Sequence, residues 1–282
     1  MAMNPSPLLI HFGDQAVSLQ CDDLEMAAYL AEMFRHSLDG RYPPHATYHI
    51  SQNDHGRFVL RRDGHSLQTG PTAVALLPWL MQDLVSALIE AQTNHLIFHA
   101  GGVIVDEMGV FLGGPTGSGK STLTACLLAN GATYLSDEVA ALSPGDPPTM
   151  TGLARPLVLK EALPPAWAPW LPDPTSPPLA AMTDGTHWIL PAWMGAGVTA
   201  GPAPLRLLLF PTYRADVSLD IRPLTPAEAA FHLLQNLVNA RNLPDKGVSS
   251  AANIARHVPA YQIAYDEATA VAAWIHDQSL RL

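Results

Sequence analysis

The apolar positions in the first third of the chain follow two periods. Short apolar runs beside glycine- and asparagine-containing turns are typical of strands, and longer stretches carry apolar residues three or four positions apart, which indicates helices. This mixture predicts a small α+β region over residues 1–92. The expected strands are residues 8–10, 16–19, 48–50 and 58–61, and the expected helices are residues 23–38 and 72–91.

From residue 93 to residue 282 the pattern predicts a larger α/β domain. Two apolar runs, 102–105 and 110–112, are joined by the turn 106–109, which is typical of a hairpin. A glycine-rich loop and a helical run follow, and Asn130-Gly131 is a typical helix C-cap. Thr225 and Glu228 form a capping box pattern around a proline at the first helical position. The other expected elements are helices at 120–129, 225–239 and 266–277 and strands at 205–210 and 261–265.

Residues 145–204 are rich in proline and tryptophan. They contain 13 prolines and four of the six tryptophans of the chain. Because proline removes a backbone donor and interrupts helices and central strands, we expect irregular structure here. Two interpretations remain open, a lid or acceptor-binding segment with a rigid aromatic surface and an irregular insertion whose tryptophans fill the core.

The strongest chemical signal lies between residues 114 and 122. It fits G-x-x-x-x-G-K-[S/T], the Walker A pattern of a phosphate-binding loop (P-loop). Glycines let the backbone curl so that several N–H groups point at one phosphate chain, and the next helix adds its unpaired amides and positive dipole end. In this pattern Lys120 reaches the β- and γ-phosphates, and the Ser121 hydroxyl ligates Mg²⁺. The predicted nucleotide-binding residues are Gly114, Pro115, Thr116, Gly117, Ser118, Gly119, Lys120, Ser121 and Thr122.

A pair of carboxylates follows the loop at a short distance. Asp137 and Glu138 come 17 and 18 residues after Lys120, which leaves room for one helix and one turn. We therefore expect the strand that precedes Asp137 to lie close to the strand that enters the loop, with both carboxylates at its exit. One carboxylate can orient Mg²⁺ while the other accepts a proton from a hydroxyl. The alternative is a solvated acidic turn.

Two histidines precede the hairpin. His95 and His99 are four residues apart, which would suit a metal site on a helix, but the glycines and β-formers that follow predict a strand. We expect a structural role for His95 and no zinc site.

Composition excludes several classes of partner. The chain has 282 residues and a formal net charge of −10 with only 15 basic residues, which argues against nucleic-acid binding. Cys21 and Cys126 are far apart in sequence and indicate reduced thiols. The N-terminus lacks the pattern of a secretory signal, and the apolar segment 72–91 contains Pro78 and several polar residues, so it predicts no membrane span. We expect a cytoplasmic protein.

These motifs together resemble a known family. Residues 98–101, the hairpin, the loop at 114–121 and the sequence Ser136-Asp137-Glu138 resemble the catalytic domain of HPr kinase/phosphorylase, and more specifically its shorter bacterial HPr-kinase-related proteins. The resemblance covers residues 95–142 and extends more loosely through 155–160 and 211–214. It implies a P-loop kinase of phosphoenolpyruvate-carboxykinase-like fold, on a mixed and strongly curved sheet. Since family members often form hexamers, it also implies a homo-oligomer.

The resemblance also implies roles for individual residues. Asp137 matches the catalytic aspartate that acts as general base toward a serine hydroxyl, and Glu138 stands where the family has a second aspartate that assists Mg²⁺. His99 matches an active-site histidine near the phosphates. Arg155 and Lys160 are candidates to neutralise phosphate charge. The chain lacks the family's Glu-Ile-Arg-Gly-Leu-Gly signature after the acidic pair, so we do not expect phosphorylase activity.

The sequence therefore predicts an ATP- and Mg²⁺-dependent kinase with serine of a small protein or peptide, such as a precursor peptide, as acceptor. Catalysis is assigned to Asp137, Lys120 and His99, and the metal to Ser121, Glu138 and Asp137. Two alternatives remain open. One is a kinase for a small-molecule hydroxyl, and the other is a P-loop ATPase or nucleotide-binding switch without a phospho-acceptor.

Overall fold

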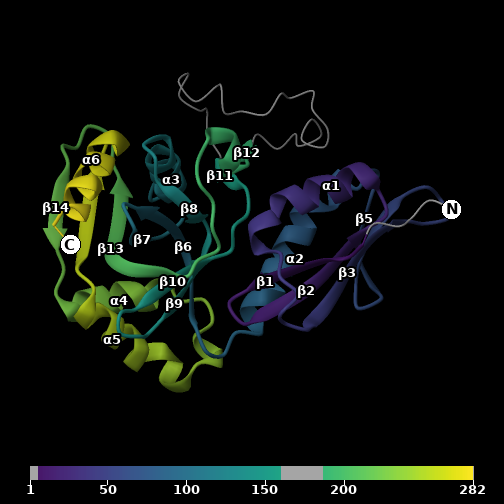
Figure 1. The fold of residues 1–282 in the computed structure, drawn as a ribbon, viewed down its shortest axis with the longest axis horizontal. Helices are drawn as coiled ribbons and strands as arrows, with labels where there is room; N and C mark the ends of the chain where they lie inside the picture. Colours follow the sequence, from purple (N-terminus) through teal and green to yellow (C-terminus); the bar gives the residue numbers. More distant parts are fainter. Residues whose placement is uncertain (1–5, 160–186, 282) are drawn as a thin grey trace. The chain divides into compact units, whose positions relative to one another are not determined.

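The computed structural model describes residues 6–159 and 187–281 (Figure 1). These residues form two compact units. The first holds residues 6–91 and 187–189, and the second holds residues 92–159 and 190–281. Residues 160–186 of the proline-rich segment, which include Lys160, Trp167 and Trp170, lie outside the described residues.

The first unit is an α+β unit. Its described strands form a five-stranded sheet in the order β1-β2-β3-β4-β5, in which only β2 and β3 run parallel. Two helices pack against this sheet, and Asp83 of the second accepts a hydrogen bond of 2.6 Å from the buried Tyr48. The elements are β1 (Leu8–Phe12), β2 (Gln15–Cys21), α1 (Leu24–Met33), β3 (Pro44–Gln52), β4 (Phe58–Arg62), β5 (His65–Gly70) and α2 (Leu77–Glu90), with short 3₁₀ helices at Arg35–Ser37 and Val74–Leu76.

The second unit contains a mixed sheet with helices on both faces. Its described strands follow the order β10-β9-β6-β7-β13-β15-β14, and β8 pairs with β6 beside β9. The strands are β6 (Leu96–Val105), β7 (Met108–Gly113), β8 (Thr133–Ser136), β9 (Val139–Ser143), β10 (Thr149–Gly152), β13 (Ala203–Tyr213), β14 (Asp220–Pro223) and β15 (Ala260–Tyr265). The helices are α3 (Lys120–Ala129), α4 (Pro226–Asn236), α5 (Val248–His257) and α6 (Ala268–Ser279), with 3₁₀ helices at Pro191–Met194, Ala240–Asn242 and Pro244–Gly247. The short strand β11 (Leu157–Leu159) of this unit and the short strand β12 (His187–Ile189), which belongs to the first unit, flank the undescribed segment.

The core of the second unit lies between its sheet and the helices α4 and α5. Phe98, Phe111 and Phe210 come from three neighbouring strands, and their rings meet edge to face at 5.2 and 6.3 Å between centroids. Leu233 of α4 and Ile254 of α5 join this cluster. Helices α3 and α6 lie on the opposite face of the sheet (Figure 1). The chain therefore passes from β7 directly into α3 on this second face of the sheet.

The predicted mixed α/β class is confirmed, and so is the hairpin, although its turn is shorter than expected. The turn consists of Asp106 and Glu107 alone, both with positive φ (47° and 68°). Two such residues match the right-handed twist of the flanking strands. The predicted helix 120–129 is confirmed at both ends. Within the described chain, β5, β9, β10, β14 and α5 are elements that the sequence pattern did not predict.

Three predicted helices end or begin elsewhere for physical reasons. The helix predicted at 72–91 begins at Leu77, with Pro78 in its first turn. Because proline has no backbone N–H, a helix that began several residues earlier would lose an intrahelical hydrogen bond at Pro78. The helix predicted at 23–38 ends at Met33 and continues as the tighter 3₁₀ turn. The helix predicted to reach 239 ends at Asn236, because Val238 donates its backbone N–H to the carbonyl of Ile97 at 2.8 Å.

Two other sequence predictions concern thiols and membranes. Cys21 and Cys126, which both lie in the described chain, are buried and unpaired, as expected for reduced thiols. Burial raises the pKa of the Cys21 thiol to about 11, which makes it a poor nucleophile. Among the helices that the structure describes, none is both long enough and apolar enough to cross a bilayer.

The capping box of α4 gives a test of the fold. Thr225 Oγ1 accepts the N–H of Glu228 at 3.3 Å, and the Glu228 carboxylate accepts the N–H of Thr225 at 2.9 Å. Hydrogen bonds from Arg222 and Thr225 lower the pKa of Glu228 to about 2, so this carboxylate is charged at neutral pH. We predict that Thr225→Ala lowers the free energy of unfolding by about 1 kcal/mol, measured by urea denaturation at pH 7. Thr225→Ser keeps the hydroxyl and should be close to the unchanged protein, and an equal loss in both variants would contradict this role.

Candidate functional site

The predicted phosphate loop follows a fully buried strand. All six residues of β7 are buried, and the chain then passes through residues 114–119 into α3. Strand β7 runs parallel to β13, and β13 runs parallel to β15. Since the carboxyl ends of parallel strands meet at one edge of a sheet, the loop lies at the same edge as the ends of β13 and β15. Ligands of open α/β sheets bind at this edge.

Lys120 is buried beneath the loop. Its ammonium donates hydrogen bonds to the carbonyl oxygens of Gly114, at 2.6 Å, and Pro115, at 2.9 Å, and only 6% of the residue is exposed. A buried ammonium requires such partners, because desolvation of an unpaired charge is costly. The loop therefore closes around a fixed positive charge, which suits an anionic ligand.

Two glycines give the loop its curvature. Gly117 and Gly119 have φ values of 84° and 90°, a region that other residues rarely adopt. At Gly119 a Cβ would also lie 2.4 Å from the hydroxyl oxygen of Tyr265 and 3.1 Å from Cβ of Tyr213. Gly119 is thus required both by its backbone conformation and by the close approach of two tyrosines.

Three side chains or backbones outside the motif hold the loop in place. Asn236 of α4 accepts the N–H of Gly114 at 3.1 Å, and the Tyr265 hydroxyl donates to the carbonyl of Gly119 at 3.2 Å. The backbone N–H of Tyr213 donates to the carbonyl of Ser118 at 3.0 Å. Sequence reasoning missed Asn236, Tyr213 and Tyr265 as site residues, because they lie more than 90 positions from the loop and no local motif marks them.

A polar side chain of the loop that lacks a hydrogen-bond partner among the described residues would suit a bound phosphate. Ser118 is 5% exposed, and its hydroxyl has no hydrogen-bond partner among the described residues. A buried hydroxyl without a partner is unfavourable unless a ligand or water supplies one. The N-terminus of α3 begins at the next residue but one, with Ser121 half-buried and Thr122 exposed in its first turn. These groups could hold the phosphates and metal of a bound nucleotide.

The acidic pair lies level with the loop on the other side of β6. Strands β8 and β9 both pair antiparallel with β6, and Asp137 and Glu138 lie between them, directly after the end of β8 at Ser136, as expected for carboxylates at a strand exit. The N–H of Ala100 donates to the carbonyl of Glu138 at 3.0 Å, and Ala100 faces Gly113 of β7 on its other side. Two strand spacings of about 4.8 Å each place the backbone of the pair about 10 Å from the start of the loop.

Asp137 is held by donors on both carboxylate oxygens. The Tyr134 hydroxyl donates to Oδ1 at 3.1 Å, and the N–H of Val158 donates to Oδ2 at 3.1 Å. Burial, and the charge of Asp137, raise the pKa of Tyr134 well above its usual value, so its hydroxyl remains a donor. Each carboxylate oxygen has a second lone pair that can accept from a further donor, and only 4% of the residue is exposed.

Arg155 joins the acidic pair. It forms an ion pair with Glu138 through Nη2, and its Nε lies 3.9 Å from Oδ1 of Asp137. Arg155 is 8% exposed, and Nε has no hydrogen-bond partner among the residues that the structure describes. The structure thus brings Arg155, Asp137 and Glu138 together. Lys160, the other predicted basic residue, lies outside the described chain.

His99 lies on β6 directly opposite Val139, next to the acidic pair. Since alternate residues of a strand share a face, His99 is on the same side as Gly101, which packs against Thr124 of α3. His99 is therefore on the face of the sheet that α3 covers. His95 forms a 2.8 Å hydrogen bond with the Ser143 hydroxyl, which agrees with a structural role. In the described ranges, no group of three or more His, Cys, Asp or Glu residues could hold a metal ion.

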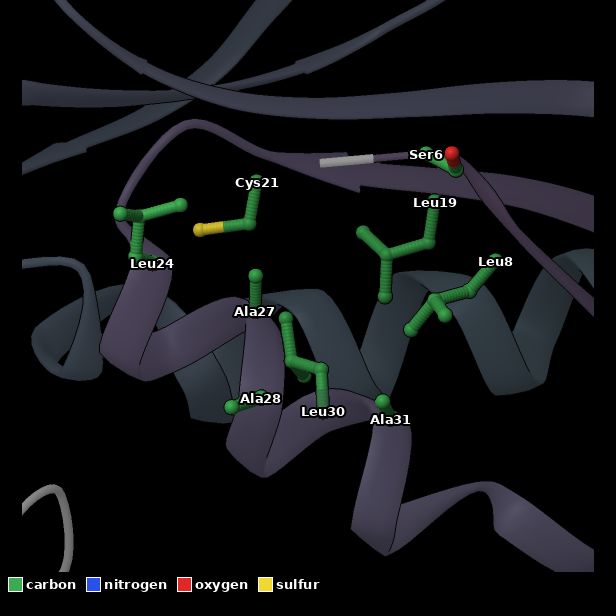
Figure 2. Close-up of a pocket in the computed structure, with 9 residues that line it drawn as sticks. All are labelled: Ser6, Leu8, Leu19, Cys21, Leu24, Ala27, Ala28, Leu30 and Ala31. Carbon is green, nitrogen blue, oxygen red and sulfur yellow. The ribbon is translucent and has the colours of Figure 1, made fainter. Parts of the chain in front are cut away.

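A separate cavity lies in the first unit. Its volume is about 290 Å³, and it is lined by residues of α1 and of the strands β1 and β2 (Figure 2). The lining is apolar, with Leu8, Leu19 and Leu30 among its side chains and Ser6 at its edge. None of the described residues that line it is charged, so this cavity does not suit a phosphate.

Comparisons with known proteins give a distant structural similarity. No protein-family model and no curated protein matches the sequence. The structure is similar to that of the HPr(Ser) kinase/phosphatase from Coxiella burnetii, at 13% sequence identity and a TM-score of 0.35. The match covers 66% of this chain and 97% of that chain. At these values the relationship between the two structures is distant.

The two left-handed glycines allow a matched test of the loop. We predict that Gly119→Ala abolishes measurable binding of Mg²⁺–ATP, because the added Cβ collides with the Tyr265 hydroxyl in addition to straining φ. Gly117→Ala is the control, since no described atom lies within 4 Å of its Cβ and only the φ strain of about 1 kcal/mol applies. Calorimetric titration and thermal denaturation of both variants would measure this difference. Equal effects of the two substitutions would contradict the packing role of Gly119.

Proposed function

We propose that this chain is an ATP- and Mg²⁺-dependent kinase that transfers the γ-phosphoryl group to a hydroxyl, with serine of a small protein or peptide as the acceptor. One observation carries the proposal. A carboxylate pair, with Asp137 buried and Glu138 partly exposed, and the predicted phosphate loop lie level with each other on the two sides of β6. A loop alone would support nucleotide binding, whereas an oriented carboxylate beside it supports transfer to a hydroxyl.

Phosphate binding is assigned to the loop and the first turn of α3. Lys120 supplies a buried positive charge, and the Ser118 hydroxyl and the free amides of the helix N-terminus supply hydrogen-bond donors. When bound, ATP with Mg²⁺ supplies the phosphoryl group and neutralises part of its charge. The Ser121 hydroxyl and the Glu138 carboxylate are oxygen ligands of the kind that Mg²⁺ prefers.

Asp137 is assigned the role of general base. Its contacts with Tyr134 and Val158 fix the carboxylate, so that it can take the proton of the acceptor hydroxyl. That oxygen would form its bond to the γ-phosphorus while the bond from this phosphorus to the bridging oxygen breaks and ADP leaves. Positioning of this kind accounts for most of the catalysis expected in phosphoryl transfer. Catalysis is assigned to Asp137, Lys120 and His99. His99 lies on the α3 side of β6 and is assigned to the phosphates, as the resemblance implies.

Arg155 is assigned to the transferred phosphoryl group. A guanidinium binds phosphate oxygens in the same forked geometry that it uses for carboxylates. Because Arg155 is now paired with Glu138, phosphate binding would exchange one anionic partner for another and release Glu138 toward the metal.

The choice of acceptor rests on different grounds from the choice of reaction. The acidic pair supports a hydroxyl acceptor of any kind, and the resemblance of the motifs to HPr-kinase-related sequences favours serine in a peptide over a small molecule. A nucleotide-dependent switch would use the loop and a carboxylate that holds Mg²⁺, but it would need no general base for an acceptor hydroxyl.

The main test is Asp137→Asn. Asparagine has the same shape, and it can still accept from the Val158 N–H while its amide group donates to the Tyr134 oxygen, so the fold should be retained. We predict a loss of about 100-fold or more in kcat for transfer of labelled γ-phosphate to serine-containing peptides, with the Kd for ATP within about threefold of its original value.

Lys120→Ala provides the contrasting variant. It removes the charge beneath the loop and should weaken ATP binding and stop turnover together. Full activity of Lys120→Ala would refute the proposed function. Release of inorganic phosphate by the unchanged protein, with no labelled product in any peptide or hydroxyl compound, would favour the ATPase alternative.

The ion pair of Glu138 allows a test of the metal assignment. We predict that Glu138→Gln raises the Mg²⁺ concentration for half-maximal activity about tenfold, because it removes one anionic oxygen ligand. Glu32→Gln is the matched control, since both glutamates pair with an arginine and their side chains are 39% and 44% exposed. Activity at several Mg²⁺ concentrations would measure the shift. An unchanged Mg²⁺ dependence in Glu138→Gln would remove Glu138 from the metal site.

A further inference from the structure

Tyr213 is the last residue of β13 and lies against the phosphate loop. Its N–H donates to the carbonyl of Ser118, and its Cβ lies 3.1 Å from the point that a Cβ of Gly119 would occupy. In the parallel pairing of β13 with β15, Tyr213 stands opposite Tyr265. The backbone of Tyr213 is therefore fixed to the loop on one side and to β15 on the other.

The side chain of Tyr213 is only partly used by the fold. Tyr265 is 1% exposed and donates its hydroxyl to the loop, whereas Tyr213 is 52% exposed. The two rings meet edge to face, with 6.0 Å between centroids and an angle of 73° between planes. This contact orients the Tyr213 ring while half of its surface remains open to solvent beside the loop. An oriented and exposed aromatic ring is a suitable surface for stacking.

The sheet order indicates which part of a nucleotide would reach Tyr213. The acidic pair lies on the β8–β9 side of β7, and Tyr213 lies on the β13 side. The phosphate that is transferred must face the acceptor and the acidic pair. The nucleoside at the other end of the triphosphate is then directed away from the acidic pair, toward β13.

We propose that Tyr213 is the stacking platform for the base of the bound nucleoside triphosphate. This inference rests on the proposed function, since it requires the phosphates to occupy the loop. Every nucleobase has a π-face, so stacking on Tyr213 contributes affinity without selecting one base. The platform thus distinguishes a nucleoside triphosphate from an inorganic polyphosphate with the same phosphate chain.

The test compares ATP with inorganic tripolyphosphate. Calorimetric titrations of both ligands, with Mg²⁺ present, would use the unchanged protein and the variants Tyr213→Ala and Tyr213→Phe. We expect Tyr213→Ala to weaken ATP binding about tenfold and to leave tripolyphosphate binding within twofold. Tyr213→Phe keeps the ring and should retain the ATP affinity. Phe231→Ala removes another exposed aromatic of the same unit, 61% exposed, and should leave both affinities unchanged.

The other outcomes separate this inference from the function beneath it. If tripolyphosphate and ATP bind but Tyr213→Ala does not weaken ATP, the platform is wrong and the phosphate site stands. Equal weakening of both ligands would assign Tyr213 to the shape of the loop and would also overturn the platform. A loss confined to peptide phosphorylation, with ATP affinity intact, would assign the ring to the acceptor instead. If the unchanged protein binds neither ligand, the proposed function itself fails.

Discussion

Gly119 packs so closely against the hydroxyl of Tyr265 that a side chain at this position would collide with it. The shape of the predicted phosphate loop depends on this contact. Tyr265 is buried at the end of β15, and its hydroxyl holds the carbonyl of Gly119. The left-handed turn at Gly119 directs the chain into α3, so that Lys120 returns beneath the loop to the carbonyls of Gly114 and Pro115. A local backbone requirement is therefore met by a residue about 150 positions away.

The central strand β6 sets the distance between the two halves of the candidate site. Its residue Ala100 pairs with Gly113 of β7 on one side, and on the other side the N–H of Ala100 donates a hydrogen bond to the carbonyl of Glu138. Because strands in a sheet keep a nearly constant spacing, this pairing fixes where the acidic pair stands relative to the loop. Residues 137–138 belong to neither β8 nor β9, and the two carboxylates lie at this break in the pairing with β6.

The charged groups at this site are paired with one another. Arg155 and Asp137 are both almost fully buried, and burial of an isolated charge would be strongly unfavourable. The ion pair of Arg155 with Glu138, and the hydrogen bonds of Asp137 with Tyr134 and Val158, offset this cost. Anion binding beside Arg155 would change these partners, so the proposed chemistry and the local stability share the same groups.

Local patterns in the sequence determined the loop, the hairpin before it, both ends of α3 and the capping box of α4, because each depends on neighbours within a few residues. The spacing of Asp137 from Lys120 also predicted carboxylates at a strand exit, and the pair follows β8 directly after Ser136, before the ladder continues with β9. The end of α4 was mispredicted because a distant carbonyl, that of Ile97, takes the N–H of Val238.

The sequence by itself therefore predicted a phosphate loop and determined where the helix after it starts. Only the tertiary structure decided which side chains surround it. Asn236, Tyr213 and Tyr265 reach the loop through α4 and the parallel pairing of β7, β13 and β15, and Arg155 reaches Glu138 through the chain that follows β10. Parallel strands need long crossovers, so the residues that meet at their ends are far apart in sequence and carry no local signature.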